Sequence, residues 1–236
     1  MCKKCYKINT TNYTGKPSTC QFDTERINTM AQKIDISDLK VEFFADKTVK
    51  NFTLSVADPE SKLGLGNMAA EAAAHASALA LRAVRKTASE DEAMKRAESD
   101  LETLRTYFVH LLDEENKARM PLEKRLAAGG PENEIEGGYR TACVIVDEIL
   151  YSAIRMIETV NGISDKVCPC TASLCAAAIY YAKLAMECVR LQLAVYSTKM
   201  NEEVYARTTR REPEIAIEGV SELANGLIKK FEDMIK

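Results

Sequence analysis

The chain has 236 residues, of which 46% are apolar and 28% are charged, and it contains no tryptophan. This balance is typical of a globular protein with one sizeable hydrophobic core or two small ones. The net charge of −3 at pH 7 argues against a nucleic-acid partner, because nucleic-acid-binding proteins usually carry a strongly basic patch. No run approaches the roughly 18 apolar residues of a membrane span, so we expect no membrane contact.

The N-terminal part of the chain is polar, contains many turn formers and has no helical or strand period. We interpret residues 1–34 as a loose tail before a helical domain over 35–236. The tail has basic residues but lacks the apolar segment of a secretory signal, so we expect a cytoplasmic protein. The eight cysteines are then expected to be reduced thiols rather than a disulfide framework.

The next elements are two predicted helices joined by a glycine-containing loop. An amphipathic pattern predicts a short helix over about 37–47, and a loop follows as far as Gly66. Asn67 is expected to cap the second helix, which runs to about Lys86 and consists largely of alanine.

A long helix is predicted after this alanine-rich one. The segment "SEDE" over 89–92 has the pattern of a capping box. Leucines and Phe108 then recur at spacings of three and four residues, which favours one apolar stripe. Pro121 is expected to break the helix, because proline cannot donate to the helical hydrogen-bond ladder.

The C-terminal half contains three further predicted helices. A turn and a short polar segment over 127–138 lead into a helix over 139–160. A break over 161–170 precedes a second alanine-rich helix over 171–198, and a terminal helix is predicted over 213–236. No run alternates with period two. We therefore predict an all-α fold, a single-domain antiparallel helical bundle with two Ala-rich central helices.

The two alanine-rich helices are predicted to pack against each other at close range. Small side chains let two helix axes approach near the short end of the usual range of about 8–10 Å. The alternative is that alanine serves helix propensity alone. The alanines concerned are Ala69, Ala70, Ala72, Ala73, Ala74, Ala76, Ala78 and Ala80 in the first helix, and Ala176, Ala177, Ala178, Ala182 and Ala185 in the second.

The loop Gly64-Leu65-Gly66-Asn67 is a candidate ligand cradle. Glycines let the backbone approach a ligand, and the N-terminus of the following helix offers free N–H groups. The loop fits neither a Walker motif, which needs Gly-Lys-Ser/Thr, nor a dinucleotide-binding fingerprint, which needs a preceding strand. A simple turn is the alternative.

An acidic cluster, Asp113-Glu114-Glu115, lies in the C-terminal part of the long predicted helix. Negative charge there opposes the helix dipole. One interpretation is a solvated acidic face. The other is a site in which one carboxylate is held for proton transfer or faces a cation.

The cysteines suggest no metal centre. Those near the second break have no histidine nearby, and their spacing does not pair two Cys-x2-Cys knuckles. Those of the N-terminal tail lack a fourth ligand. We therefore expect structural, redox-inert thiols at Cys168, Cys170, Cys175 and Cys188, and no metal at Cys2, Cys5 and Cys20.

From about Ile36 to Lys236, the order and spacing of these elements resemble the formiminotetrahydrofolate cyclodeaminase and methenyltetrahydrofolate cyclohydrolase family. In that family a Pro-Gly-Gly-Gly-Ser loop leads into an alanine-rich helix, and the loop at 64–67 stands in its place. The family's long helix carries Leu-Ile-Asp-x-Asp-x-x-Ala-Phe. Here Asp113 and Glu115 match the two acids, and Arg119 stands at the aromatic position.

Two later motifs of the family have weaker counterparts in this sequence. The family's Ser-Asp loop corresponds to Ser164 and Asp165. This pair lies about five residues farther from the following helix than the family's Ser-Asp does. An ungapped alignment would instead place Pro169 and Cys170 at the Ser-Asp positions. The family's Asn-Val-x-x-Asn-Leu becomes "CVRLQL" over 188–193, with Gln192 at the second asparagine position.

The resemblance implies an all-helical homodimer that acts on a tetrahydrofolate one-carbon derivative and requires no metal or organic cofactor. It implies catalytic roles for Asp113, Glu115 and Asp165, and substrate-binding roles for Gly64, Leu65, Gly66, Asn67, Arg190 and Gln192.

Two reactions are compatible with these residue types. In the cyclohydrolase reaction, water attacks the cationic methenyl bridge and 10-formyltetrahydrofolate forms. In the cyclodeaminase reaction, N10 attacks the formimino carbon and ammonia leaves. Both need a proton carrier and negative charge beside a delocalised cation. The alternative is a non-catalytic helical dimer of the same fold that binds folate or another small ligand.

Overall fold

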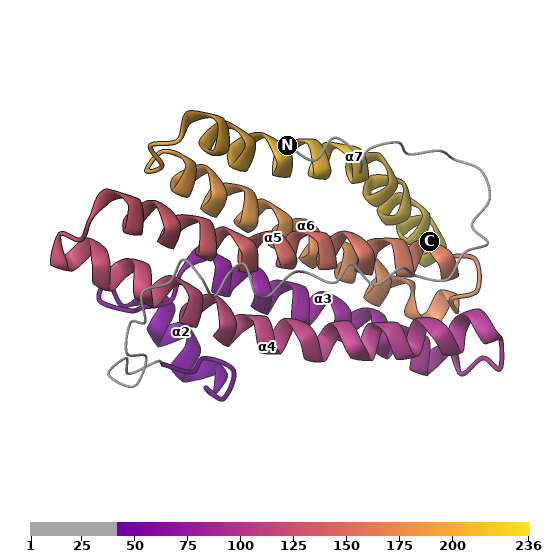
Figure 1. Cartoon of the computed structure of the whole chain (residues 1–236). Helices are drawn as coiled ribbons and strands as arrows, with labels where there is room; N and C mark the ends of the chain where they lie inside the picture. The colour runs from indigo at the N-terminus through magenta and orange to yellow at the C-terminus, as the bar shows by residue number, and fades with distance from the viewer. Residues whose placement is uncertain (1–41) are drawn as a thin grey trace. The chain divides into compact units, whose positions relative to one another are not determined.

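The computed structural model describes residues 42–236 (Figure 1). The tail predicted over 1–34 and the first part of the helix predicted over 37–47 lie outside these residues. The remainder of that predicted helix, over 42–47, is not helical. Instead, Thr48 caps α2 (Val49–Ala57) by accepting the Asn51 amide hydrogen, where a loop was expected.

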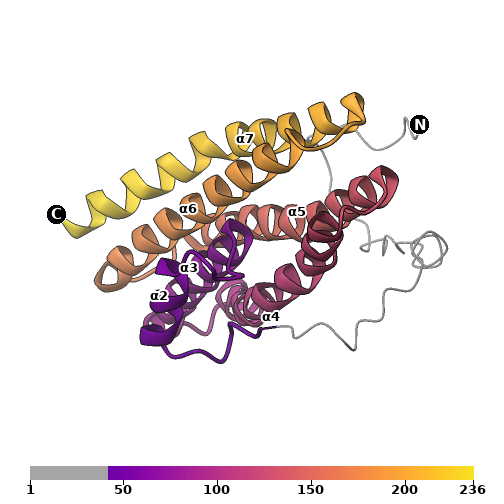
Figure 2. The ribbon, with the colours of Figure 1, turned by 90° about the vertical axis from the view of Figure 1, so that its left-hand side faces the viewer.

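Among residues 42–236, five long helices make the bundle: α3 (Leu65–Thr87), α4 (Glu92–Ala128), α5 (Glu132–Ile163), α6 (Ala172–Ser197) and α7 (Glu203–Ile235). Short connections make chain neighbours antiparallel, as Figure 1 shows. Figure 2 shows α6 between α7 on one side and α3 and α5 on the other. No strand occurs over 42–236, so the predicted all-α antiparallel bundle is confirmed.

The alanine-rich helices α3 and α6 form the centre of the bundle and make its most extensive helix pair. Both helices contain fully buried alanines, among them Ala73, Ala76, Ala178 and Ala182. Large side chains of the other helices supply the remaining core, among them Leu101, Phe108, Ile149, Met156 and Phe231. The predicted close packing of the two alanine-rich helices is therefore confirmed.

The helix starts differ from the predicted ones by a few residues. The N-cap of α3 is Gly64, and Asn67 lies at the third helical position. The N-cap of α4 is Asp91 rather than Ser89, since its carboxylate accepts the amide hydrogens of Ala93 and Met94.

Both prolines that were expected to bound a helix lie inside one. α4 continues through Pro121 to a left-handed Gly129 with φ of 65°, and α7 already begins at Glu203, ahead of Pro213. Buried side chains on both sides of Pro121, such as Arg119 and Leu122, anchor the helix. Their packing outweighs the one backbone hydrogen bond that proline removes.

The polar segment after Gly129 belongs to α5 rather than to a turn. Pro131 caps the helix, and the early residue Glu134 forms an ion pair of 3.3 Å with Arg125 on α4. This contact across the turn favours helix in a segment without a strong apolar period.

In the described part of the chain, one helical stretch, Pro169–Ser197, is long and apolar enough to cross a membrane by length and composition. Half of its most apolar window is buried inside the structure, and the core helix of a soluble protein passes the same test. The expectation of no membrane contact remains a prediction.

Candidate functional site

The glycine loop lies directly on α4. A Cβ added to Gly66 would fall 2.6 Å from Cγ of Glu115, and one added to Gly64 would fall 3.3 Å from Nε of Arg119. The first distance is too short for any side chain. Glycine is therefore required for the start of α3 to lie against the acidic segment of α4.

Asn67 joins the two helices at this point and is fully buried. Its Oδ1 accepts the Gly64 amide hydrogen at 2.8 Å, and its Nδ2 donates to the carbonyl of Leu112 at 2.7 Å. The side chain thus satisfies one of the free amides of the α3 N-terminus and fixes α3 to α4.

Glu115 and Arg119 form a buried ion pair one turn apart on α4. Glu115 is 1% exposed, and Nε of Arg119 donates to its two carboxylate oxygens at 3.1 and 3.4 Å. The other guanidinium nitrogens bond the Glu123 carboxylate, the Lys62 carbonyl and, at 3.3 Å, Oδ1 of Asn116. The guanidinium therefore also joins the loop before α3 to α4.

Burial raises the pKa of the Glu115 carboxyl, and the charge and hydrogen bonds of Arg119 oppose that shift. The second carboxylate, Glu123, raises the pKa further by like-charge repulsion. A buried carboxyl with a raised pKa holds its proton closer to neutral pH than a solvated one does, which suits a proton carrier.

Tyr196 extends this cluster from α6. Its side chain is 5% exposed, and its buried hydroxyl has no hydrogen-bond partner among residues 42–236. Burial, and after it the negative charge of Glu115, raises the pKa of Tyr196, which reflects the proximity of the two groups. The ring stacks edge to face on Tyr139 at 5.6 Å.

Asp113 contacts a different part of the chain from Glu115. Its Oδ1 accepts the amide hydrogens of Phe44 at 2.7 Å and Ala45 at 3.2 Å. The two acids point to different sides of α4, because two residues correspond to about 200° around a helix. Asp113 therefore anchors the segment before α2.

Asp165 is not brought together with the other two predicted acids. Its side chain is 91% exposed and pairs with Lys230 on α7 at 2.7 Å. The adjacent Lys166 pairs with Asp91, the N-cap of α4. Glu115 lies about 24 residues farther along that helix, or roughly 36 Å at 1.5 Å per residue.

Of the other predicted binding residues, Gln192 is buried near the cluster, whereas Arg190 and Leu65 are partly or fully exposed. Gln192 is buried on α6 one turn before Tyr196, so the two share a face of the helix. Arg190 is partly exposed and bonds Glu187 at 2.7 Å. Leu65, in the glycine loop, is exposed.

An apolar cavity of about 280 Å³ lies one to two turns from the Glu115 cluster. The aromatic rings of Phe44, Phe52 and Phe108 line it together with Leu112, whose carbonyl binds Asn67 of the cluster. Polar groups are present at its edge, including Lys47 and a His75–Glu71 pair of 2.6 Å.

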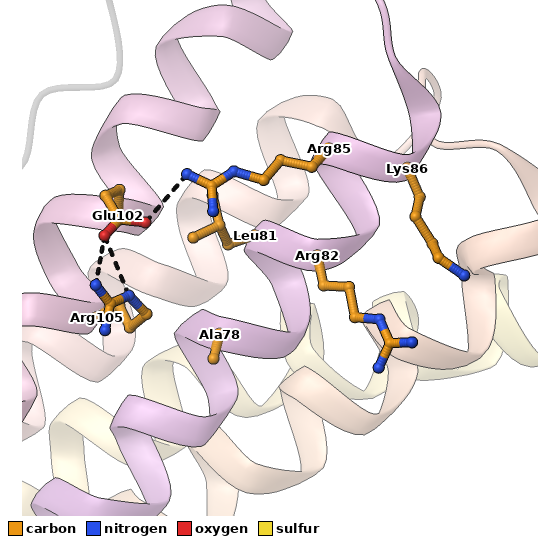
Figure 3. A pocket seen from close by; sticks show the side chains of 7 residues that line it. All are labelled: Ala78, Leu81, Arg82, Arg85, Lys86, Glu102 and Arg105. Atoms are coloured by element: carbon orange, nitrogen blue, oxygen red, sulfur yellow. Dashed lines mark hydrogen bonds and ion pairs between the residues drawn. The ribbon is translucent and has the colours of Figure 1, made fainter.

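A larger hollow of about 550 Å³ lies between the C-terminal half of α3 and α4 (Figure 3). Its basic residues are Arg82, Arg85, Lys86 and Arg105, and Glu102 bonds two of them, as the dashed lines show. The hollow is distant from the glycine loop, so we place the candidate site at the Glu115 cluster and the apolar cavity.

The cysteines differ in part from expectation. Cys168 and Cys170 form a disulfide, so the expectation of reduced, redox-inert thiols is wrong for this pair, whereas Cys143, Cys175 and Cys188 are free. Within residues 42–236, no group of three or more potential ligands could hold a metal ion.

Two residues of the Glu115 cluster, Arg119 and Tyr196, were not predicted from the sequence. Arg119 was noted only as a departure from an aromatic position, although its spacing of four from Glu115 is a local signal for an ion pair. The signal for Tyr196 was weak, since only its spacing of four from Gln192 marks it.

No family model and no curated protein matches the sequence. Among solved structures, the chain is similar to the crystal structure of formiminotetrahydrofolate cyclodeaminase from Thermotoga maritima, with a TM-score of 0.67 and 16% identity. The match covers 80% of this chain and 96% of that chain. At this identity the likeness shows a common fold.

Proposed function

We propose that the chain binds a tetrahydrofolate one-carbon derivative and acts on it with Glu115 as the proton carrier. The reaction is hydrolysis of 5,10-methenyltetrahydrofolate to 10-formyltetrahydrofolate, or cyclisation of 5-formiminotetrahydrofolate with loss of ammonia. The observation that carries the proposal is the buried Glu115 carboxyl under the glycine loop. The fold shared with a formiminotetrahydrofolate cyclodeaminase supports it.

The residues around Glu115 suit the chemistry of either reaction. The carboxyl can take the proton of the attacking water or of N10, since burial raises its pKa toward neutrality. Arg119 orients the carboxyl, and the unpartnered Tyr196 hydroxyl offers a second hydrogen-bonding group. In its ionised form, Glu115 places negative charge beside the cationic one-carbon bridge.

The apolar cavity suits the flat ring system of such a substrate. Its volume of about 280 Å³ is slightly below the usual range of ligand pockets, about 300–1,000 Å³. It therefore accommodates a ring system rather than a complete folate, whose remaining atoms extend outside. In this arrangement Asp113 supports the cavity wall through the Phe44 amide and does not contact the reacting carbon.

A second candidate is a non-catalytic protein of the same fold that binds folate or another small ligand. The observation that favours it is the occupancy of both Glu115 oxygens by Arg119, which stands where the family has an aromatic residue. Asp165 also fits this candidate, because it is exposed and its end of α4 lies about 36 Å of helical rise from Glu115.

We further propose a cytoplasmic homodimer that binds no nucleic acid and requires no metal or organic cofactor. The support for a dimer is an apolar stripe on α6, at spacings of four and seven residues, that is 45–53% exposed in the single chain: Tyr180, Leu184, Leu191 and Val195. A second copy covering the stripe would bury it. Light scattering of wild type and Leu184→Glu tests this, and a wild-type monomer would contradict it.

Turnover and binding measurements separate the two candidates. The assay follows the absorbance of methenyltetrahydrofolate, as its loss and as its formation from the formimino substrate, against a protein-free control. Glu115→Gln should lower turnover by about 100-fold or more. The matched control is Asp165→Asn, which removes an exposed acid at the other end of the bundle and should turn over at the wild-type rate.

The possible outcomes point to different conclusions. If the wild type binds the folate in calorimetry but turns over neither substrate, the non-catalytic candidate holds. If Glu115→Gln is as active as the wild type, the catalytic assignment is wrong. Absence of both binding and turnover overturns the folate proposal as a whole.

A further inference from the structure

The disulfide between Cys168 and Cys170 lies in the connection between α5 and α6. Cys170 is exposed and Cys168 is partly buried. The Cys168 amide donates to Oγ1 of Thr87 at the C-terminal end of α3. The pair is therefore at the opposite end of α3 from the glycine loop, and the proposed folate reaction does not use it.

The sulfur of Cys168 occupies a position that stabilises negative charge. Cys168 is the N-cap of the 3-10 turn Pro169–Thr171, which continues directly into α6. Its Sγ accepts the backbone amide hydrogen of Cys170 at 3.3 Å. This donated N–H favours a thiolate over a thiol.

The backbone around the pair is fixed without the sulfur–sulfur bond. The amide and the hydroxyl of Thr171 both donate to the Cys168 carbonyl at 2.9 Å, and the neighbouring Val167 is buried. Breaking the disulfide therefore leaves the two sulfurs close together and able to form the bond again.

We propose that Cys168 and Cys170 are a redox-active dithiol–disulfide pair that exchanges with low-molecular-weight thiols of the glutathione class. In the reductive direction, the thiolate of one thiol attacks the exposed Cys170 sulfur. The bond between the two cysteines breaks, and its electron pair leaves on Cys168, the better leaving group. A second thiol attacks the mixed disulfide and releases Cys170. Two thiols thus give one disulfide and supply two electrons and two protons to the protein.

The other described cysteines lack this environment and serve as internal controls. Burial raises the pKa of Cys143 and of Cys175 to about 12. Burial, and then the charge of Glu187, raises the pKa of Cys188. None of these three has a sulfur partner, so they should respond neither to glutathione buffers nor rapidly to alkylation.

The test uses the full-length protein equilibrated in buffers with a series of ratios of reduced to oxidised glutathione. Acid quenching, alkylation with iodoacetamide and peptide mass spectrometry then report the state of each cysteine. The peptide with Cys168 and Cys170 should change from disulfide to doubly alkylated across the series. Cys188→Ser should leave that transition unchanged, and Cys168→Ser should accumulate glutathione on Cys170.

The thiolate is tested separately in the variant Cys170→Ser. The alkylation rate of Cys168 should reach half its maximum at least one pH unit below the value of about 8.5 for an ordinary cysteine. A midpoint at or above 8.5 overturns the proposal. A pair that remains a disulfide in reduced glutathione alone, or remains reduced in oxidised glutathione alone, also overturns it.

Discussion

The backbone of Gly66 and the side chain of Glu115 are in close contact where α3 begins on α4. A methyl group on Gly66 would lie 2.6 Å from Cγ and 2.9 Å from Oε1 of Glu115, so the glycine and the buried carboxyl depend on each other. Gly66→Ala should force Glu115 out of contact with Arg119 and lower the free energy of unfolding by roughly 1–3 kcal/mol.

The matched control for this prediction is Gly226→Ala. Gly226 lies inside α7, and nothing within 4 Å would meet an added Cβ, so alanine should stabilise the protein by about 0.5–1 kcal/mol through helix propensity. Urea unfolding followed by circular dichroism measures both, since the chain has no tryptophan. Equal effects of the two substitutions would contradict the close approach of Gly66 to Glu115.

The second prediction concerns the ion pair of Glu115 and Arg119. Arg119→Met removes the guanidinium and leaves a buried carboxylate without its partner, which should cost about 3–5 kcal/mol of unfolding free energy. The double variant Glu115→Gln, Arg119→Met has no buried charge at this pair and should be more stable than Arg119→Met alone. A double-mutant cycle in urea measures the coupling, and strictly additive effects would show that the two side chains do not interact.

The third prediction tests the contact between α3 and α6. Ala178 is fully buried, and Ala178→Leu should destabilise the protein by roughly 1–3 kcal/mol through overpacking. Ala74 is only half-buried and borders the apolar cavity, so Ala74→Leu has room for the added atoms and should cost less. Thermal unfolding of both variants decides this, and an equal cost would mean that the cavity is not free space.

The fourth prediction is a pH dependence due to Asp147 on α5. Burial, and then the negative charge of Glu212, raises the pKa of this carboxyl from 3.8 to about 7. Between about pH 4 and 7 the folded protein therefore retains a proton that the unfolded chain has lost. The contribution of Asp147 to the free energy of unfolding therefore falls as the pH rises through that window, and it is constant above about pH 7.

Asp147→Asn removes this titration. The free energy of unfolding of the variant, relative to wild type, should rise between pH 4.5 and 7.5 by on the order of 2 kcal/mol, less than the full shift because the side chain is partly exposed. Asp46→Asn, at an exposed position, controls for the loss of one carboxylate. A difference that does not change with pH would be evidence against a buried Asp147 carboxyl.

The helices could be predicted because their signals are local. The alanine runs and the apolar stripe that includes Phe108 have helical spacing, and packing of α3 on α6 followed from side-chain size. Even α2 had a local signal, since Thr48 is a typical N-cap. Pro121 and Pro213 were misjudged, because local propensity does not include the tertiary contacts that hold a helix through a proline.

The site was harder to predict because it depends on which ends of the helices meet. The glycine loop and Glu115 were identified separately, and only the antiparallel arrangement of α3 and α4 explains their contact. The same topology moves Asp165 to the opposite end, beside Asp91. Tyr196 reaches the cluster across more than 75 residues of sequence, a separation that periodicity cannot detect.

The alanine contact between α3 and α6 limits how the sequence can drift. Alanine is already the smallest residue that favours a helix, so positions such as Ala73 and Ala178 can change only toward glycine or serine without adding volume. Glycine at such a position would cost about 1 kcal/mol of helix propensity. Leucine positions at the periphery of the core can instead exchange with other aliphatic residues of similar volume. Substitutions should therefore accumulate on the outer helices, while the centre of the bundle retains small residues in any chain that keeps this helix spacing.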